Sequence, residues 1–325
     1  MKLRILSAND VRQALPMADA IEAMRGAFRA LHDKQVTMPV RLALPTPAGI
    51  MLFMPAFNAG TGGLGQKVVS VFGKNPERGL PTIHALVTMY DATTGLPLAL
   101  LEGTYLTALR TAAVTGLGTD VLARQDSRVL TIFGAGAAAA TQIEAVCTVR
   151  PIEQVWIISR SDSAQKLAVQ LQQADPTRTY QATTDREAAT RAADVIITAT
   201  SSFTPVFDGS WVEPGTHVNA VGSFRPDMQE IDSTLIKRAI VVVDEKEGAL
   251  EEAGDLLVPM SKGEWEFGQL YAELSELVAG AVPIPQEEGQ ITYFKSCGLA
   301  IEDVAAGQAI LRVAEEKGLG QIVEL

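Results

Sequence analysis

The sequence predicts an α/β protein in which a doubly wound parallel sheet accompanies a second, α+β domain. From residue 128 onward, short β-branched segments alternate with helical segments, which is typical of βαβ units. Before residue 104, several strand-like segments follow one another with only Pro, Gly and Asn between them, as in a sheet whose strands are joined by turns. The two halves therefore differ in their architecture.

The first half begins with an expected amphipathic helix over residues 7–34, with Asn9 or Asp10 placed to cap it. Strands are expected over residues 38–44, 50–55, 65–72, 83–91 and 97–101. Residues 91–95 are predicted to form the turn of a hairpin, and residues 104–122 to return to helix.

The second half begins with a predicted strand at 129–133, a helix at 141–149 and a strand at 154–158. Further strands are expected at 193–199, 217–221 and 239–244. Residues 245–280 are expected to be helical, residues 291–294 to form a final strand, and residues 299–317 a helix that rejoins the first domain. We therefore predict one domain from residues 1–115 and 299–325, and a nucleotide-binding domain from residues 116–298.

Composition limits the classes of partner. The chain has 325 residues, 47% of them hydrophobic, and a formal net charge of -11, which argues against nucleic acid or an anionic membrane as a partner. Polar residues interrupt the N-terminal segment too early for a signal-peptide core, and no apolar run reaches membrane-spanning length. We expect a cytoplasmic protein. Cys147 and Cys297 form no metal-binding pattern.

A glycine turn follows the strand at 129–133. Gly134 allows a tight turn, Gly136 removes a Cβ so that backbone approaches a phosphate, and Ala139 lets the next helix pack closely. This arrangement is typical of a Rossmann dinucleotide site, in which the helix N-terminus faces the pyrophosphate. The residues predicted to contact the cofactor here are Gly134, Ala135, Gly136, Ala137 and Ala138.

The strand at 154–158 is followed by Ser159, Arg160 and Ser161, where NAD-selective sites carry an acid that binds the ribose. Arg160 suits a 2′-phosphate, so NADPH is the predicted cofactor and NADH remains possible. The alternative is a solvated Arg160, with Asp162 binding the ribose. Other predicted cofactor contacts follow the next two strands: Thr200, Ser201, Val221 and Gly222.

Three cations stand in apolar or glycine-rich surroundings ahead of the nucleotide domain: Arg41, Lys67 and Arg110. A buried charge is costly without an anionic partner, so their convergence would form a pocket for a substrate carboxylate. Thr111 either supports this pocket or caps a helical turn. The alternative for each cation is a position on an edge strand or a helix surface.

Several motifs together resemble the ornithine cyclodeaminase and mu-crystallin family over nearly the whole chain. They are Arg41, Gly65-Gln-Lys67, Thr107-Ala-Leu-Arg110-Thr-Ala-Ala113, Gly134-Ala-Gly136, Gly222-Ser-Phe-Arg-Pro-Asp227 and Gly298-Leu-Ala-Ile-Glu-Asp303. The resemblance implies a homodimer, and it implies that Arg41, Lys67 and Arg110 hold the substrate carboxylate beside the nicotinamide. The family includes cyclodeaminases, alanine dehydrogenases, ketimine reductases and a thyroid-hormone-binding protein.

Two departures separate this chain from the cyclodeaminase branch. Leu52 stands where the resemblance to that branch implies a glutamate, and Phe224 stands where it implies an aspartate. Moving protons between the two nitrogens of a diamino acid needs such a carboxylate. We accordingly expect no acid near the cations that could expel ammonia. The segment Ser223–Asp227 instead resembles the mu-crystallin and ketimine reductase branch, where only hydride transfer is required.

The predicted reaction is the NAD(P)H-dependent reduction of a cyclic α-imino acid, Δ1-pyrroline-2-carboxylate or Δ1-piperideine-2-carboxylate, to L-proline or L-pipecolate. Arg41 and Arg110 are expected to clamp the carboxylate, and Lys67 to add charge and help protonate the imine. Asp227 is a second proton-relay candidate, a helix cap or a loop residue, whereas Lys295 and Asp303, which flank a glycine turn, are interpreted as helix-capping residues. The alternatives are an amino-acid dehydrogenase, a cyclodeaminase and a nucleotide-dependent ligand-binding protein.

Overall fold

The computed structural model describes residues 1–285, 287 and 289–325, and the chain folds into two compact units. Unit 1 comprises Met1–Thr111 with Gly298–Leu325, and unit 2 comprises Ala112–Cys297. The first boundary falls inside helix α3 (Gly103–Leu122). Within the described residues, no helix is long and apolar enough to cross a membrane.

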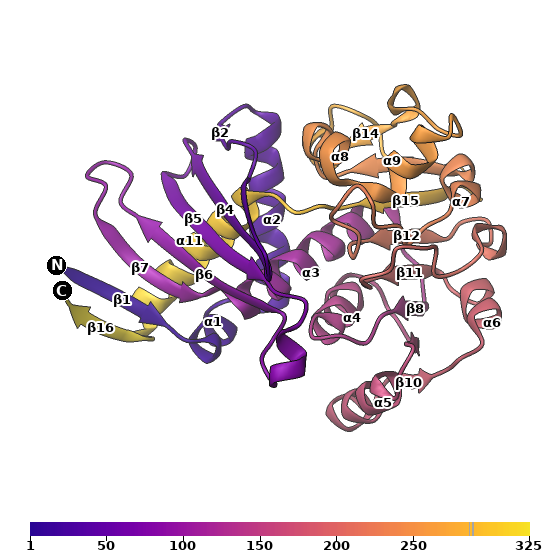
Figure 1. Cartoon of the computed structure of the whole chain (residues 1–325), viewed down its shortest axis with the longest axis horizontal. Helices are drawn as coiled ribbons and strands as arrows, with labels where there is room; N and C mark the ends of the chain where they lie inside the picture. Colours follow the sequence, from indigo (N-terminus) through magenta and orange to yellow (C-terminus); the bar gives the residue numbers. More distant parts are fainter. Residues whose placement is uncertain (286, 288) are drawn as a thin grey trace. The chain divides into compact units, whose positions relative to one another are not determined.

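Unit 1 is built on one mixed sheet (Figure 1). Its strands lie in the order β16 (Gln321–Glu324), β1 (Lys2–Leu6), β7 (Pro97–Glu102), β6 (Ile83–Tyr90), β5 (Gly63–Val71), β4 (Gly49–Asn58) and β2 (Val36–Thr37), with β3 (Leu42–Thr46) also paired to β4. The strands β4 to β7 are antiparallel neighbours, as consecutive hairpins require. A short 3₁₀ helix, η1 (Asn75–Arg78), lies in the connection between β5 and β6.

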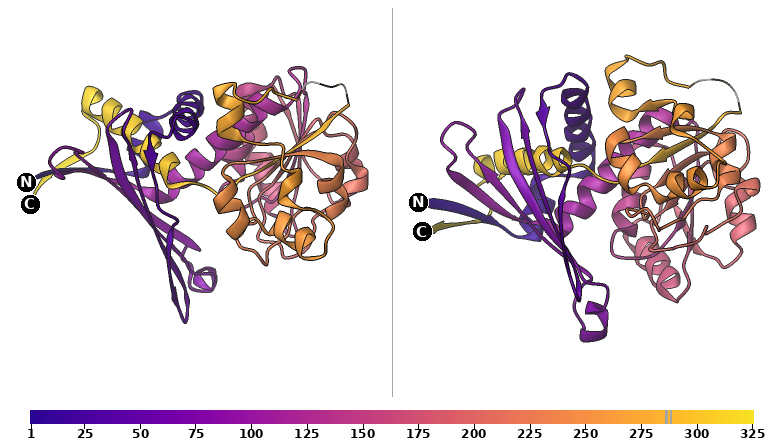
Figure 2. Two further views of the ribbon diagram at one scale, coloured as in Figure 1. Left: turned by 90° about the horizontal axis from the view of Figure 1, so that it is seen from above. Right: turned by 45° about the horizontal axis from the view of Figure 1, so that its top comes forward.

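One face of this sheet is covered by helices, which creates the core of unit 1. Helix α11 (Ala300–Lys317) packs on β4, β5 and β6 and also contacts α2 (Met17–His32), and Figure 2 shows it lying across the strands. The buried side chains alternate along the strands, as a half-covered sheet dictates. Those on this inner face include Met54, Val69, Val87, Met89 and Leu101.

Three local expectations for unit 1 are corrected. Residues 7–34 form two helices, α1 (Ala8–Ala14) and α2, because Pro16 cannot continue a helix and stands at the N-cap of the second. The first helix is capped by Ser7, which forms a capping box with Asp10. The expected strand at 38–44 is only partly present, since β3 begins at Leu42, residues 38–41 belong to no strand, and β2 ends before this range.

Unit 2 is a parallel sheet with the doubly wound order expected from the sequence. Its strands run β10 (Thr179–Ala182), β9 (Gln154–Ile158), β8 (Val129–Phe133), β11 (Val195–Thr198), β12 (His217–Ala220), β15 (Ile291–Lys295), β13 (Ala239–Val243) and β14 (Ala272–Glu273). From β8 the chain winds outward to β9 and β10, then returns to β11 on the other side. This reversal is the switch point at which such sheets bind ligands.

Helices on both faces of this sheet enclose two apolar clusters. Along β11, Ile196 belongs to one cluster, whereas Val195 and Ile197 belong to the other, so the strand is buried on both sides. The helices and 3₁₀ turns are α4 (Ala139–Val149), α5 (Ser163–Ala174), α6 (Arg186–Arg191), η2 (Gly209–Trp211), α7 (Ser233–Arg238), α8 (Lys246–Glu252), α9 (Gly254–Ser261), η3 (Phe267–Gln269) and α10 (Leu274–Ala279).

Two further expectations are corrected in unit 2. Residues 245–280 are not one helical stretch, since α8, α9, η3, β14 and α10 divide them. The strand at 291–295, β15, is not the last of the chain, because β16 follows it and belongs to the sheet of unit 1. Within the sheet of unit 2, β15 lies between β12 and β13.

Candidate active site

The glycine turn after β8 has the geometry that a dinucleotide site needs. Gly134 has a φ of +112°, and a Cβ there would stand 2.4 Å from the carbonyl oxygen of Ala199, so only glycine fits. A Cβ at Gly136 would meet no protein atom within 4 Å, which leaves the space beside its backbone free for a ligand. Ala139 is buried at the start of α4, as close packing of helix on strand requires.

This turn forms part of a cavity of about 510 Å³ at the carboxyl ends of β8, β9 and β11. Eight of the predicted cofactor residues line it: Gly134, Ala135, Gly136, Ser159, Arg160, Ser161, Thr200 and Ser201. Ala137 and Ala138 lie in the turn itself, with the Ala138 carbonyl accepting from the Thr141 hydroxyl. Val221 packs on an apolar cluster, and its role and that of Gly222 in cofactor binding stay predictions.

The loop after β9 carries hydroxyls and a cation but no acid directed at the cavity. The Ser159 hydroxyl donates to the Ser161 carbonyl at 2.7 Å and accepts the Ala164 N–H at 3.1 Å, which ties the loop to α5. Asp162 instead pairs with Lys166 at 2.7 Å, and 72% of its side chain is exposed. The cavity wall therefore presents Arg160 rather than a carboxylate.

A second feature is a buried group of four charges in unit 1, here called the β5–α11 cluster: Lys67, Arg110, Glu302 and Asp303. The Lys67 Nζ lies 2.8 Å from Asp303 Oδ2, and the Arg110 Nε donates to Asp303 Oδ1 at 3.1 Å. The Arg110 Nη1 donates to Glu302 Oε2 at 2.5 Å. All four side chains are nearly inaccessible to solvent. Two of the three cations that were expected to converge, Lys67 and Arg110, thus meet at Asp303, and their convergence on a substrate carboxylate stays a prediction.

The backbone explains why these charges meet. Lys67 lies on the inner face of β5, opposite Met54 and Val87 in the sheet register, and α11 packs across that face. Gly298 has a φ of +86°, and a Cβ there would stand 2.6 Å from Arg110 Nη1, so this glycine makes room for the guanidinium. The Glu302 carboxylate also accepts the Leu299 N–H at 3.0 Å, which begins α11 beside the cations.

Burial changes the proton affinity of the cluster. Desolvation and the nearby Arg110 charge lower the pKa of Lys67 to about 8, against the opposing pull of Asp303. Burial also disfavours the charge of Arg110, but Asp303 and Glu302 outweigh this effect and raise its pKa. Lys67 is therefore the member of the cluster poised to exchange a proton near neutral pH.

One expectation about an acid is wrong, because Asp303 is not a helix cap but binds both cations. Glu302 and Asp303 do contact the cations, and the expectation that no acid near them is able to expel ammonia stays a prediction. The available signal was an adjacent acidic pair within the otherwise apolar first turn of the helix at 299–317.

The remaining predicted substrate-binding and catalytic residues are Arg41, Thr111 and Asp227. Arg41 is partly buried just before β3, and Thr111 follows Arg110 in α3. Their approach to Lys67 stays a prediction. Asp227 pairs with Arg225 at 2.7 Å, and 54% of its side chain is exposed. Its role as a proton relay also stays a prediction.

Sequence reasoning missed a second buried charged group, here called the β15–α9 cluster: Ser223, Glu230, Asp255 and Lys295. Lys295 is fully buried, not a helix-capping residue, and its Nζ lies 3.2 Å from Asp255 Oδ2 and donates to the Ser223 carbonyl at 2.5 Å. Burial and the neighbouring Asp255 raise the pKa of Glu230. The Glu230 carboxylate nevertheless accepts the N–H groups of Thr200 and Gly222, which holds the loop bearing Thr200 in place at the cavity.

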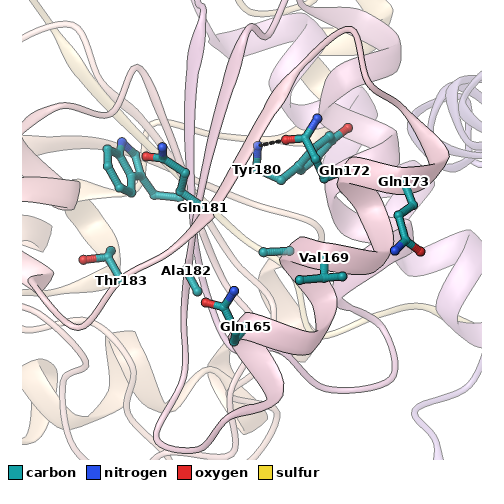
Figure 3. A pocket seen from close by; sticks show the side chains of 10 residues that line it. Gln165, Val169, Gln172, Gln173, Tyr180, Gln181, Ala182 and Thr183 are labelled. Carbon is teal, nitrogen blue, oxygen red and sulfur yellow. Dashed lines mark hydrogen bonds between the residues drawn. The ribbon is translucent and has the colours of Figure 1, made fainter.

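A further cavity of about 520 Å³ lies between α5 and the edge strand β10 (Figure 3). Gln172 there accepts the Tyr180 N–H at 3.1 Å and donates to the Arg178 carbonyl at 2.9 Å. This carboxamide occupies backbone groups that an additional strand would otherwise pair with. The Gln172 side chain thus protects part of this sheet edge.

Comparison with known proteins identifies the family. A Δ1-pyrroline-2-carboxylate reductase of Bacillus cereus is 39% identical over 98% of this chain and 99% of its own length. The structure of the Thermococcus litoralis Δ1-pyrroline-2-carboxylate reductase with NADH and L-proline matches with a TM-score of 0.95 at 37% identity, over 98% of this chain and 100% of that one. An archaeal alanine dehydrogenase dimer with bound NAD matches with a TM-score of 0.94 at 34% identity, over the full length of both chains. Residues 1–318 match the ornithine cyclodeaminase/mu-crystallin family, to which this chain therefore belongs.

Proposed function

We propose that this protein reduces a cyclic α-imino acid, Δ1-pyrroline-2-carboxylate or Δ1-piperideine-2-carboxylate, to L-proline or L-pipecolate. A nicotinamide cofactor held in the cavity lined by Gly134, Gly136 and Arg160 would supply the hydride for the C=N carbon, and the ring nitrogen would take up one proton, so that NAD(P)H would be oxidised as the imine becomes an amine. The names of similar proteins support this chemistry, since they include Δ1-pyrroline-2-carboxylate reductases.

The observation that carries the proposal is the β5–α11 cluster. An ammonium has three N–H donors, yet within the described residues Lys67 has one ionic partner, Asp303. Its spare donors and the guanidinium of Arg110 suit a substrate carboxylate, which accepts bidentate, charge-assisted bonds. With a pKa near 8, the same ammonium is able to protonate the imine nitrogen, which makes the adjacent carbon a better hydride acceptor.

The residue at position 52 supports reduction over cyclodeamination. Leu52 is 8% exposed and its register partner is Val69, so its side chain lies on the same sheet face as Lys67. An acid there would face the cluster, whereas a leucine transfers no proton. Glu302 and Asp303 do face it, but both are engaged in ion pairs with the cations. Phe224 likewise supplies no carboxylate.

NADPH is the proposed cofactor of choice, with NADH as the alternative. The solved relatives contain NADH or NAD, so the proposal rests on this chain's own residues. Arg160 lines the cavity, and Asp162 is engaged by Lys166. A guanidinium attracts the 2′-phosphate that only NADPH carries.

We also propose that the protein is a homodimer formed through the outer face of the unit 1 sheet. On that face an apolar row crosses four strands, from Leu42 to Phe53, Val68 and Leu86, each opposite the next in register. Leu42 is 67% exposed and Leu86 is 51% exposed. Such a row favours association, and the similar alanine dehydrogenase is a dimer.

The proposed interface is tested by Leu86→Lys, which should be a monomer in analytical ultracentrifugation. Val169→Lys, the control, should stay a dimer. A dimeric Leu86→Lys variant would contradict this interface.

The reaction is tested by following NADPH and NADH oxidation with each cyclic imine and with pyruvate plus ammonia. We expect turnover with a cyclic imine, a loss of about 100-fold in kcat/KM for Arg110→Ala, and none for Arg25→Ala, a partly exposed arginine paired with Glu22. Turnover only with pyruvate and ammonia would favour an amino-acid dehydrogenase. Ammonia release from ornithine would favour a cyclodeaminase, and tight NADPH binding without turnover a ligand-binding protein.

A further inference from the structure

A second arginine faces the proposed cofactor cavity. Arg186, the first residue of α6, lines the same cavity as Arg160, although it stands 26 residues later in the chain, after β10. The parallel sheet brings them together because β9 and β10 are neighbours whose carboxyl ends meet at one edge. The sequence pattern singled out only Arg160.

The Arg186 side chain is held in position over this cavity. Its Nη1 donates to the Val206 carbonyl at 3.2 Å, and the Val206 N–H donates in turn to the Glu230 carbonyl at 2.8 Å. The Thr190 hydroxyl bonds to the Arg186 carbonyl at 2.7 Å, which fixes its backbone within α6. The guanidinium is thus anchored through one nitrogen and keeps its remaining N–H donors for another partner.

The charge around this cavity is unusual for so acidic a chain. Its lining includes two arginines and several hydroxyls but no carboxylate. Within the described part of the chain, neither Arg160 nor Arg186 forms an ion pair, whereas Arg124, Arg150 and Arg178 each do. In a protein with a net charge of -11, two unpaired guanidinium groups at one cavity leave a local positive charge for a ligand to neutralise.

We propose that Arg186 is a second anchor for the 2′-phosphate of NADPH and, with Arg160, determines the preference for NADPH over NADH. The inference rests on the proposed nicotinamide-dependent function and specifies one residue of its cofactor site. A phosphate monoester carries a charge of about -1.5 to -2 at neutral pH, so one guanidinium does not neutralise it whereas two do. NADH carries a hydroxyl in place of the 2′-phosphate, so it has no anionic group here for a second arginine to bind.

The test measures binding in the absence of any imine. Dissociation constants for NADPH, NADH, adenosine 2′,5′-bisphosphate and 5′-AMP would be determined by calorimetry for wild type, Arg186→Gln, Arg186→Lys and Arg160→Gln. The matched control is Arg191→Gln, on the same helix but paired with Glu187 and Glu213. Arg186→Gln should weaken NADPH and the bisphosphate by about 10-fold or more, the size of one charge-assisted hydrogen bond.

NADH and 5′-AMP should change less than about twofold in Arg186→Gln, and Arg186→Lys should restore part of the NADPH affinity because a charge remains. Equal weakening of NADPH and NADH would overturn the proposal, since Arg186 would then contact a part common to both cofactors, such as the adenine. If the ratio of NADPH to NADH affinity were unchanged in Arg186→Gln but lowered in Arg160→Gln, the role of Arg186 would be refuted and that of Arg160 kept. If this ratio were unchanged in both variants, the proposed NADPH preference would be refuted. The proposed imine reduction is tested separately, by turnover.

Discussion

The two buried charged clusters of this protein differ in what their donors and acceptors bind. In the β15–α9 cluster, the acids mostly accept backbone N–H groups: Glu230 binds Thr200, Gly222 and Ser223, and Asp255 binds Glu230 and Ile231. In the β5–α11 cluster, the bonds run mainly between side chains, and the Lys67 ammonium has donors to spare.

We interpret this difference as one between a scaffold and the proposed substrate site. A carboxylate saturated by backbone donors holds loops in place, and any ligand would have to displace those bonds at a high cost. A buried ammonium with unused donors is instead incomplete until a ligand arrives. Two charged clusters of equal burial are therefore expected to respond differently to mutation.

The largest expected effect is on stability, from Lys295→Met. This change leaves Asp255 and Glu230 buried without the cation that faces them, at a cost of about 3–5 kcal/mol. Urea denaturation would measure the free energy of unfolding, with the exposed Lys246→Met as control. A loss below about 1 kcal/mol would contradict the scaffold role.

Lys67→Met should affect activity more than stability. Arg110 remains against Asp303 in this variant, so the acid keeps a partner and the loss of stability should be smaller than in Lys295→Met. The value of kcat/KM for the cyclic imine should fall by about 100-fold, because both the charge and the proton donor are removed. Lys74→Met, an exposed change in the same unit, is the control. If Lys67→Met turned over the cyclic imine as fast as wild type, the β5–α11 cluster would have a structural role only.

The pH profile should report the same lysine. Because the ammonium form is the proton donor and its pKa is lowered to about 8, kcat/KM should be level below that pH and decline above it. The decline approaches about tenfold for each further pH unit. Lys67→Arg, which keeps the charge over this range, should lose this limb, whereas a limb retained in that variant would belong to the substrate or to another group.

The smallest effect is expected from Asp162→Asn. Asp162 is already paired with Lys166 and exposed, so removing its charge should alter the ratio of NADPH to NADH affinity by less than about twofold. Calorimetric titration with both cofactors would measure this ratio. A selective loss of NADH affinity would instead show that Asp162 binds the ribose and would restore the alternative to Arg160.

Much of the architecture follows from local sequence patterns. The βαβ alternation after residue 128 predicted the parallel sheet, and the turn at Gly134, where a dinucleotide site is predicted, lines a cavity in the structure. The apolar surroundings of Lys67 and Arg110 likewise indicated two charges in need of anionic partners. In each case neighbouring residues carry the signal, because strand period, turn geometry and the cost of burying a charge are local properties.

Tertiary structure decided which partners these residues have. Arg110 and Asp303 stand 193 residues apart, and only the packing of α11 across the inner face of the sheet brings them together. Lys295 and Arg186 were likewise placed by the order of parallel strands. The short strands β1, β10 and β16 escaped prediction because their stability comes from pairing with distant neighbours, and a one-dimensional pattern does not record such pairing.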